Sequence, residues 1–189
     1  FVDFLSAGGF SYWQVLPFGL VDECNSPYKS YSTFGGNPYF VDLESLFEEG
    51  LITSEELNSA RQSTPYSCEF DRLSKERVNL LLTASKRVNN ELREKVNSFI
   101  DNNSHLKDFC RFMALKYANE DAEWVSWSIK DFNEDIEFGW RFIQFEFFTQ
   151  WAKIKGYANQ KGIGIIGDIP IYVSFDSSDV YFNKNLFMM

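Results

Sequence analysis

The residues with the clearest chemical potential follow a short apolar run near the end of the chain. The run Ile163–Ile166 is interrupted and bounded by glycine, as is typical of a strand buried in a parallel sheet. Asp168 comes directly after it, and a carboxylate is costly to bury there without a partner, so we expect it at an open strand end where it serves a site. Pro170 cannot donate to a sheet ladder, and regular pairing should end there. An Asp at this place can equally cap a loop, which leaves two interpretations open.

A second candidate lies in the loop after another short strand. Tyr12–Pro17 is aromatic and β-branched and ends at a proline, which predicts a strand. Residues 18–38 are rich in Gly, Ser, Asn and Pro yet hold Tyr28, and aromatic residues in loops are often functional. If both strands belong to one barrel, their following loops meet at one face, and Ser26 and Tyr28 then lie near Asp168. The alternative is that Tyr28 packs against its own loop.

A tyrosine ring beside a carboxylate suits a neutral, polyhydroxylated ligand. The flat apolar face of a sugar packs on the ring, and the carboxylate accepts hydrogen bonds from hydroxyl groups. The composition agrees, because a net charge of −9 disfavours nucleic acid and anionic membranes as partners. Aromatic residues make up 18% of the chain, enough to line a cleft as well as a core. We therefore expect a carbohydrate site.

The cysteine and histidine content argues against several other kinds of site. Cys24, Cys68 and Cys110 lack the paired spacing of a zinc site, and the single histidine, His105, lies in a polar stretch that we expect to be a solvated loop. A zinc centre or a Ser-His-Asp triad is not expected here, and no cofactor signature is present. The thiols favour a reducing compartment, and no apolar run reaches the ~18 residues of a membrane span, so we expect a cytoplasmic protein.

The remaining elements must position these loops. A helix ending at Gly8 and Gly9 precedes the first strand, and a long aromatic helix from Glu137 to Gly162 precedes the second. Helix, short turn and buried strand is the order of an α/β protein with a parallel sheet or a (β/α)8 barrel. Between them we predict a helical insert with its own small core, made of an extended segment at Tyr39–Leu43 and helical segments at 44–50, from Ser54, from Ser74 through Leu92, and at 106–117.

Several stretches, taken together and in order, resemble the amylomaltases, the 4-α-glucanotransferases of glycoside hydrolase family 77. These stretches are Ser11–Pro17, Asn25–Ser30, Phe34–Tyr39, Gln144–Trp151, and Ile166–Val173 with Asp176–Val180. The resemblance spans nearly the whole chain and is thinnest over residues 64–135. Each motif alone would be weak, whereas the ordered set is specific.

The resemblance implies an α/β fold in which residues 1–43 and 136–189 form part of a (β/α)8 TIM barrel, with its second and third strands. Residues 44–135 would be a mostly helical insert subdomain, and the chain would be a fragment of a longer protein. The implied activity is transfer of a 1,4-α-D-glucan segment to the 4-hydroxyl of an acceptor glucan or glucose, by double displacement with retention. The alternatives are an α-glucan hydrolase of the same barrel type and a non-catalytic glucan-binding protein.

The resemblance also implies roles for individual residues. Asp168 would shape the site for the non-reducing glucose at the cleavage point, Tyr28 would lie beside the bond being cut, and Ser26 would form hydrogen bonds on the acceptor side. Three further residues would fix loop geometry: Asn37, Asp176 and Asp179. Phe175 departs from the family, in which many members have His, so any polar role there is lost. The nucleophile and the acid/base Glu belong to later strands, so no catalytic residue is expected in this chain, and the isolated fragment should be inactive.

Overall fold

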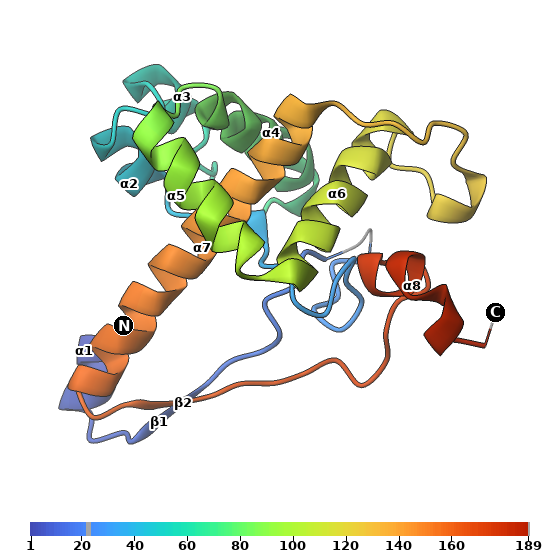
Figure 1. Cartoon of the computed structure of the whole chain (residues 1–189). Helices are drawn as coiled ribbons and strands as arrows, with labels where there is room; N and C mark the ends of the chain where they lie inside the picture. Colours follow the sequence, from blue (N-terminus) through green and yellow to red (C-terminus); the bar gives the residue numbers. More distant parts are fainter. Residues whose placement is uncertain (22–23, 189) are drawn as a thin grey trace.

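The computed structural model describes residues 1–21 and 24–188 and is rich in helix (Figure 1). Two strands are present in this part of the chain, β1 (Tyr12–Gln14) and β2 (Gly164–Ile166). The α-helices are α1 (Val2–Ala7), α2 (Leu43–Glu48), α3 (Ser54–Ser59), α4 (Phe70–Ser85), α5 (Asn90–Asp101), α6 (Ser104–Ala118), α7 (Glu134–Gln160) and α8 (Ser178–Phe182). Three 3-10 turns complete the structure: η1 (Pro38–Phe40), η2 (Trp124–Ser126) and η3 (Lys184–Leu186).

The two strands pair in parallel, as the sequence predicted, but the strand at Ile163–Ile166 is not buried as expected, because Ile166 is 47% exposed. Tyr12 lies opposite Gly164, and Gln14 lies opposite Ile166. Regular pairing is shorter than expected, although the Val15 amide still donates to the Ile166 carbonyl at 3.0 Å. Because the strands are parallel, the segments that follow them leave from the same edge of the sheet. This arrangement brings two loops together that are about 140 residues apart in the chain.

Helix α7 connects the strands to the rest of the molecule. It is 27 residues long, and its first half packs against α4, α5 and α6 while its last turns lie beside α1 and the strands (Figure 1). Asn133 caps its start by accepting a hydrogen bond from the Asp135 amide, and acidic residues follow in the first turn, where they complement the helix dipole. The chain leaves the helix through Gly162, whose φ of 78° is the left-handed conformation that favours glycine. The predicted helix is confirmed, with a start three residues earlier than Glu137.

The core contradicts one expectation about the central helices. They do not enclose a separate small core, because one cluster of buried side chains runs from Phe109 on α6 to Phe142 on α7. The same cluster includes Leu20, from the loop after β1, and Val180, from α8. A second, small cluster lies beneath the strands and consists of Val2, Leu5, Ala158 and Ile163. Helix α7 contributes side chains to both clusters. The central helices therefore share their core with the loop after β1 and with α8.

Two helix boundaries in this region were predicted wrongly. Helix α4 begins at Phe70, not at Ser74, and the apolar pattern expected to run through Leu92 is broken before α5. Asn89 makes the break, because its side chain accepts a hydrogen bond from the Leu92 amide at 2.9 Å and caps α5. His105 lies in the first turn of α6 and not in a loop, and its side chain is exposed as expected.

The extended segment expected at Tyr39–Leu43 is also absent. The Asn37 side chain accepts a hydrogen bond from the Tyr39 amide at 2.9 Å and starts η1, which has Pro38 at its first position. Asp42 then caps α2 by accepting a hydrogen bond from the Ser45 amide. Two consecutive side-chain caps therefore turn a stretch with strand-like composition into two short helical turns.

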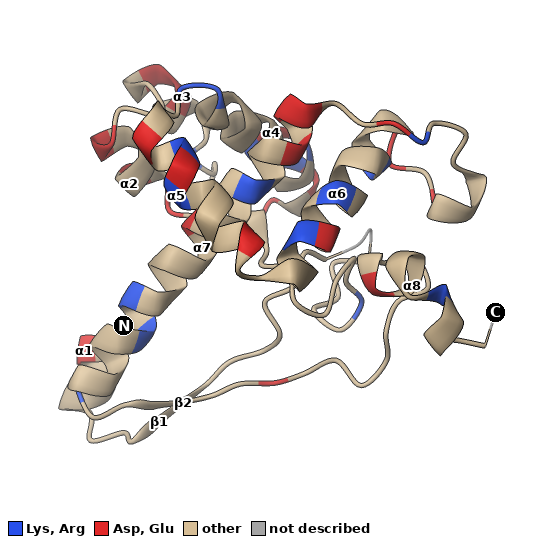
Figure 2. Ribbon diagram, viewed as in Figure 1, with Lys and Arg blue, Asp and Glu red and all other residues tan. Residues whose placement is uncertain are grey.

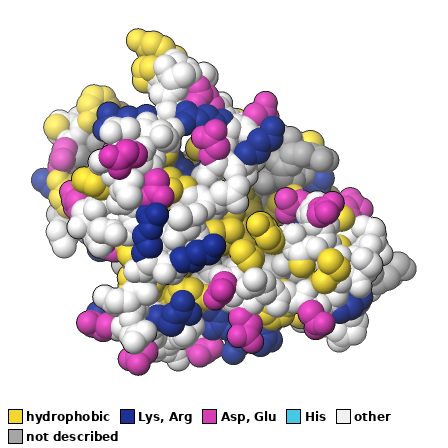
Figure 3. Space-filling model, turned by 90° about the horizontal axis from the view of Figure 1, so that it is seen from above, with side chains coloured by type: hydrophobic (Ala, Val, Ile, Leu, Met, Phe, Trp, Pro, Cys, Tyr) yellow, Lys and Arg dark blue, Asp and Glu magenta, His cyan; other side chains and the backbone are white. Residues whose placement is uncertain are grey.

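Charge is distributed unevenly over these elements. Lys, Arg, Asp and Glu gather on α2 to α7, whereas the segments around β1 and β2 are almost uncharged (Figure 2). Viewed from above, charged side chains surround hydrophobic side chains that reach the surface between them (Figure 3). None of the helices in the described part of the chain has both the length and the apolar character needed to cross a membrane.

Candidate functional site

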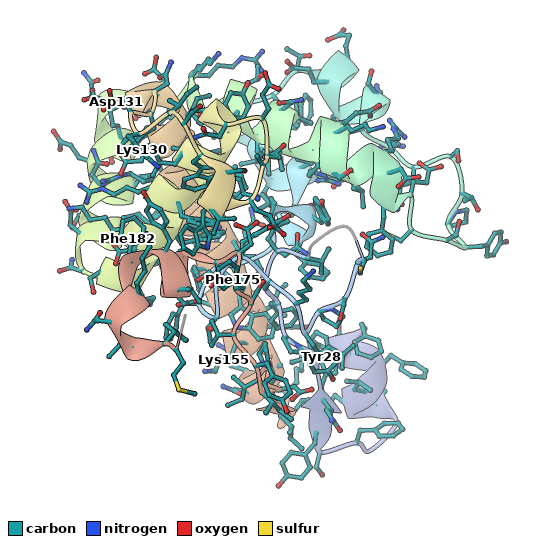
Figure 4. The ribbon with its side chains drawn as sticks, turned by 90° about the vertical axis from the view of Figure 1, so that its right-hand side faces the viewer. Tyr28, Lys130, Asp131, Lys155, Phe175 and Phe182 are labelled. Carbon is teal, nitrogen blue, oxygen red and sulfur yellow. The ribbon has the colours of Figure 1, made fainter. Side chains whose placement is uncertain are left out.

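Tyr28 and Asp168 meet at the edge where the segments after β1 and β2 emerge. The Tyr28 hydroxyl donates a hydrogen bond of 2.8 Å to Oδ2 of Asp168. Both side chains are exposed, and 47% of the Tyr28 surface is accessible. In Figure 4, Tyr28 lies on the side of α1 and the strands, away from the helices α3 to α5. The predicted proximity is therefore confirmed, and Tyr28 reaches across to the second loop instead of packing only on its own.

Asp168 keeps capacity for a ligand. Its Oδ1 accepts a hydrogen bond from the Ile169 amide at 2.8 Å, and its Oδ2 accepts the one from Tyr28. A carboxylate offers about four acceptor positions, so each oxygen of this exposed group can take one more hydrogen bond from a hydroxyl. The two protein donors fix the direction of the carboxylate. Asp168 is therefore an oriented acceptor that is open to solvent.

Ser26 shapes the turn that carries the tyrosine. Its hydroxyl accepts a hydrogen bond from the Tyr28 amide at 3.3 Å, and its carbonyl accepts one from the Lys29 amide at 3.3 Å. This is the local pattern by which serine side chains stabilise turns. The hydroxyl hydrogen of Ser26 is still available to a ligand. The structure thus brings all three predicted site residues into one neighbourhood.

The hydrogen bond between the two loops also changes the chemistry of the tyrosine. The hydrogen bond that the Tyr28 hydroxyl donates to the Asp168 carboxylate raises the pKa of Tyr28. Desolvation and the negative charge of Asp168 make smaller contributions in the same direction. The phenol therefore stays protonated and remains a donor over the whole physiological pH range. Its ring is left as a neutral, partly exposed surface of the type on which sugars pack.

The loop after β1 is held against α7 by a pair of amide hydrogen bonds. The Gly36 amide donates to Oε1 of Gln144 at 2.7 Å, and Nε2 of Gln144 donates to the Gly36 carbonyl at 3.0 Å. Gln144 is fully buried, and its amide is satisfied on both sides. A side chain at Gly36 would overlap the ring of Phe147, so glycine allows the loop to approach the helix this closely.

The residues expected to fix loop geometry do bind the loops. Oδ2 of Asp179 accepts a hydrogen bond from the Thr33 amide at 2.8 Å, which joins α8 to the loop after β1. Asp176 forms an ion pair of 2.7 Å with Lys116 of α6. Asn37 caps η1, as described above. These contacts connect both loops to the helices on one side of the site.

Phe175 contributes an apolar surface where the resemblance suggested a polar residue in relatives. Its ring packs on Trp124 with 5.1 Å between the ring centres, and its carbonyl accepts a hydrogen bond of 2.8 Å from the Trp124 indole. It is labelled in Figure 4, and 49% of its surface is exposed. The position is therefore held in place by its main chain and its ring, without a polar side chain.

Sequence reasoning missed the two buried polar residues that organise this region, Gln144 and Lys116. Each of these polar residues lies on a helix face that is otherwise apolar. This placement could have identified them, because a buried polar side chain needs a hydrogen-bond partner. Over residues 1–21 and 24–188, no group of three or more His, Cys, Asp or Glu side chains is arranged to hold a metal ion.

Comparison with known proteins identifies the family of this chain. The sequence model of glycoside hydrolase family 77, described as 4-alpha-glucanotransferase, matches residues 1–189. The chain belongs to this family. The 4-alpha-glucanotransferase of Clostridium butyricum is 38% identical over 205 residues, which cover 100% of this chain and 42% of that protein. The corresponding protein of Streptococcus pneumoniae strain TIGR4 is 35% identical over 204 residues, covering 99% of this chain and 40% of that protein.

A solved structure of the 4-alpha-glucanotransferase family is similar in fold. The amylomaltase from Streptococcus agalactiae in complex with acarbose superposes with a TM-score of 0.91 at 30% identity, over 100% of this chain and 41% of that chain. This chain thus spans about two fifths of the length of these relatives. The family assignment from the ordered motifs is confirmed.

Proposed function

We propose that this chain is part of a 4-α-glucanotransferase, an enzyme that moves a segment of a 1,4-α-glucan onto the 4-hydroxyl of another glucan or of glucose. The observation that carries the proposal is the 2.8 Å hydrogen bond between Tyr28 and Asp168 at the open edge of two parallel strands, in a chain of this family. The relative from Streptococcus agalactiae was solved in complex with acarbose, which supports a glucan-type ligand for this chain as well.

The fold proposed for the complete protein is a (β/α)8 barrel. Residues 1–43 and 136–189 would supply its second and third strands, and residues 44–135 would be a helical insert beside the cleft. The parallel pair β1 and β2, each preceded by a helix, supports this assignment, because strand and helix alternate in a barrel. The fold similarity to the amylomaltase supports it independently.

In this site Asp168 would accept hydrogen bonds from the hydroxyls of the glucose unit next to the bond being cut. The Tyr28 ring would pack on a sugar face, and its hydroxyl would keep the carboxylate in place. The Ser26 hydroxyl would bind the sugar on the acceptor side. These contacts would position the glucan and strengthen as the sugar ring distorts in the transition state.

The reacting carboxylates would come from strands outside this chain. A carboxylate would attack the anomeric carbon, and a carboxylic acid would protonate the departing glycosidic oxygen. The covalent intermediate would then be taken by a sugar hydroxyl that the same acid, now a base, deprotonates. Transfer competes with hydrolysis at this step, so the loop that carries Ser26 and Tyr28 would favour transfer by binding the acceptor and excluding water.

Product analysis with maltotriose tests the proposal. The full-length gene product should convert maltotriose into glucose together with shorter and longer maltooligosaccharides, without a net gain of reducing ends. Shorter products alone, with new reducing ends, would identify an α-glucan hydrolase. Binding without turnover would identify a glucan-binding protein. The 189-residue chain alone should be inactive in the same assay.

A further inference from the structure

Lys116 is the most completely buried charge near the two loops. Only 2% of its side chain is exposed, although it lies in the last turn of α6. Its ammonium donates to Oδ2 of Asp176 at 2.7 Å, to the carbonyl of Asp121 at 2.9 Å and to the carbonyl of Ala122 at 3.1 Å. It also lies 4.6 Å from the centre of the Tyr31 ring. All three N–H groups have acceptors and one carboxylate balances the charge, which are the conditions under which a buried ammonium is tolerated.

The partner carboxylate extends this contact into the loop after β2. Oδ1 of Asp176 accepts a hydrogen bond from the Trp124 amide at 3.1 Å, while the Trp124 indole donates to the carbonyl of Phe175 at 2.8 Å. The Trp124 and Phe175 rings also pack together. Residues 175 and 176 are therefore fixed to the segment that follows α6 through three kinds of contact.

Tyr31, whose ring contacts the Lys116 ammonium, lies in the loop after β1. The carbonyl of Tyr31 accepts a hydrogen bond of 2.9 Å from the Ser178 amide, and the Thr33 amide donates to Asp179 at 2.8 Å. The first loop is thus bonded to the first two residues of α8, the helix that directly follows the second loop. Lys116 is the side chain of α6 that contacts both Tyr31 in the first loop and Asp176 in the second.

We propose that Lys116 is a positioning residue that sets the separation of the loops carrying Tyr28 and Asp168. Its contact in the first loop is three residues from Tyr28, and its contact in the second is eight residues from Asp168. No helix or strand lies between either pair of points, and we expect a shift at the fixed end of a loop to move its site residue as well. The consequence for catalysis rests on the proposed transferase function, whereas the consequence for loop geometry does not.

Hydrogen exchange measured on the full-length protein tests the geometry. In Lys116→Met, amides in segments 30–34 and 174–179 should exchange about 10-fold to 100-fold faster, because the partly buried Asp176 carboxylate loses its counter-charge. Exchange in α5 should not change. The matched control is Lys107→Met on the same helix, since Lys107 forms an exposed ion pair of 3.0 Å with Asp101 and touches neither loop. That control should leave both segments as in the wild type.

Activity on maltotriose tests the functional consequence. A displacement of about 1 Å in a site can reduce turnover about 100-fold, so kcat in Lys116→Met should fall by that order. The share of turnovers that end in hydrolysis should rise, and this ratio is independent of how much protein is folded. Lys116→Arg keeps the charge and should recover a substantial part of both properties. Lys116 is one of the residues that line a pocket of about 640 Å³.

A second variant keeps the test valid if Lys116→Met fails to fold. Asp176→Asn preserves the size of the side chain and an acceptor for the Trp124 amide, and it removes both the ion pair and the oxygen that accepts a hydrogen bond from Lys116. Asp176→Asn should speed up exchange and raise the share of hydrolysis, as Lys116→Met does. The variant with both substitutions should show no larger effects than Lys116→Met alone. Unchanged exchange in both segments, with a wild-type hydrolysis ratio, would overturn the proposal. A wild-type protein without transfer activity would refute the proposed function, while the exchange data would still decide whether Lys116 positions the loops.

Discussion

Replacement of Glu146 by Gln should stabilise the protein, and by an amount that depends on pH. Glu146 lies on α7 with 5% of its surface exposed, and burial raises its pKa from 4.5 to about 7, with a further contribution from the charge of Glu49. The Gln150 side-chain amide donates to Glu146 Oε2 at 3.2 Å, and Lys153 also opposes the increase. These groups do not fully offset the cost of burying the charge.

The sign and size of the effect follow from the raised pKa of Glu146. Below pH 4.5 the carboxyl is protonated in both the folded and the unfolded state, so it has no pH-dependent cost. Between pH 4.5 and about 7 the unfolded state releases the proton and the folded state retains it, so stability falls as the pH rises. At about 1.4 kcal/mol for each pH unit, the full cost above pH 7 is about 3 kcal/mol. An amide avoids this cost and still accepts the hydrogen bond from Gln150.

Urea unfolding of the full-length protein between pH 5 and pH 8 measures this difference. At pH 8, Glu146→Gln should have a free energy of unfolding about 3 kcal/mol above that of the wild type, and the difference should fall to about 1 kcal/mol or less at pH 5. Glu94→Gln is the matched control, because it removes an exposed carboxylate from α5 and should leave the pH dependence unchanged. Parallel curves for Glu146→Gln and the wild type over this range would refute the argument.

Substitutions at three further positions test the site and its support. Asp168→Ala should lower kcat/KM for maltotriose about 100-fold or more with little change in Tm, because the side chain is exposed; wild-type rates would remove Asp168 from the site. Tyr28→Phe should lose only the hydrogen bond and Tyr28→Ala the ring as well, so glucan KM should rise more in the alanine variant, and equal values would exclude stacking on the ring. Gly36→Ala should destabilise the protein by about 1 to 3 kcal/mol in urea unfolding, since its Cβ would overlap Phe147; unchanged stability would mean that the loop can move away.

The part of the fold that sequence predicts well depends on strong local patterns. Helix α7 has apolar residues throughout, an acidic first turn and a glycine at its end, and each feature acts within a few residues. The strands are only three residues long, but apolar composition next to Gly162 and Pro17 was enough to place them. The parallel sheet was predicted from the order of helix, turn and strand, and the proximity of Tyr28 and Asp168 was predicted on the condition that both strands belong to one barrel.

The expectations that failed depend on contacts between distant residues or on single caps. The start of α4 is stabilised by Arg72, whose guanidinium donates to the carbonyl of Arg61, in the segment after α3, and pairs with Glu76. No local pattern at Phe70 predicts such a contact. Asn89 divides one apolar stripe into two helices because its side chain replaces a missing backbone partner. In both cases tertiary contact or one side chain outweighed the periodic pattern.

The same distinction explains which part of the site was missed. The sequence points to Asp168 and Tyr28 as an acid and a ring of the kind that bind sugars, but it does not show which residues position the loops that carry them. That spacing depends on Gln144 and Lys116, whose side chains lie on helices and bind the backbone and carboxylate of the two loops. We therefore expect these helices to affect the site through the loops that they hold. Substitutions on the buried faces of α6 and α7 should change turnover, whereas loss of the exposed pair Lys95 and Glu91 on α5 should not.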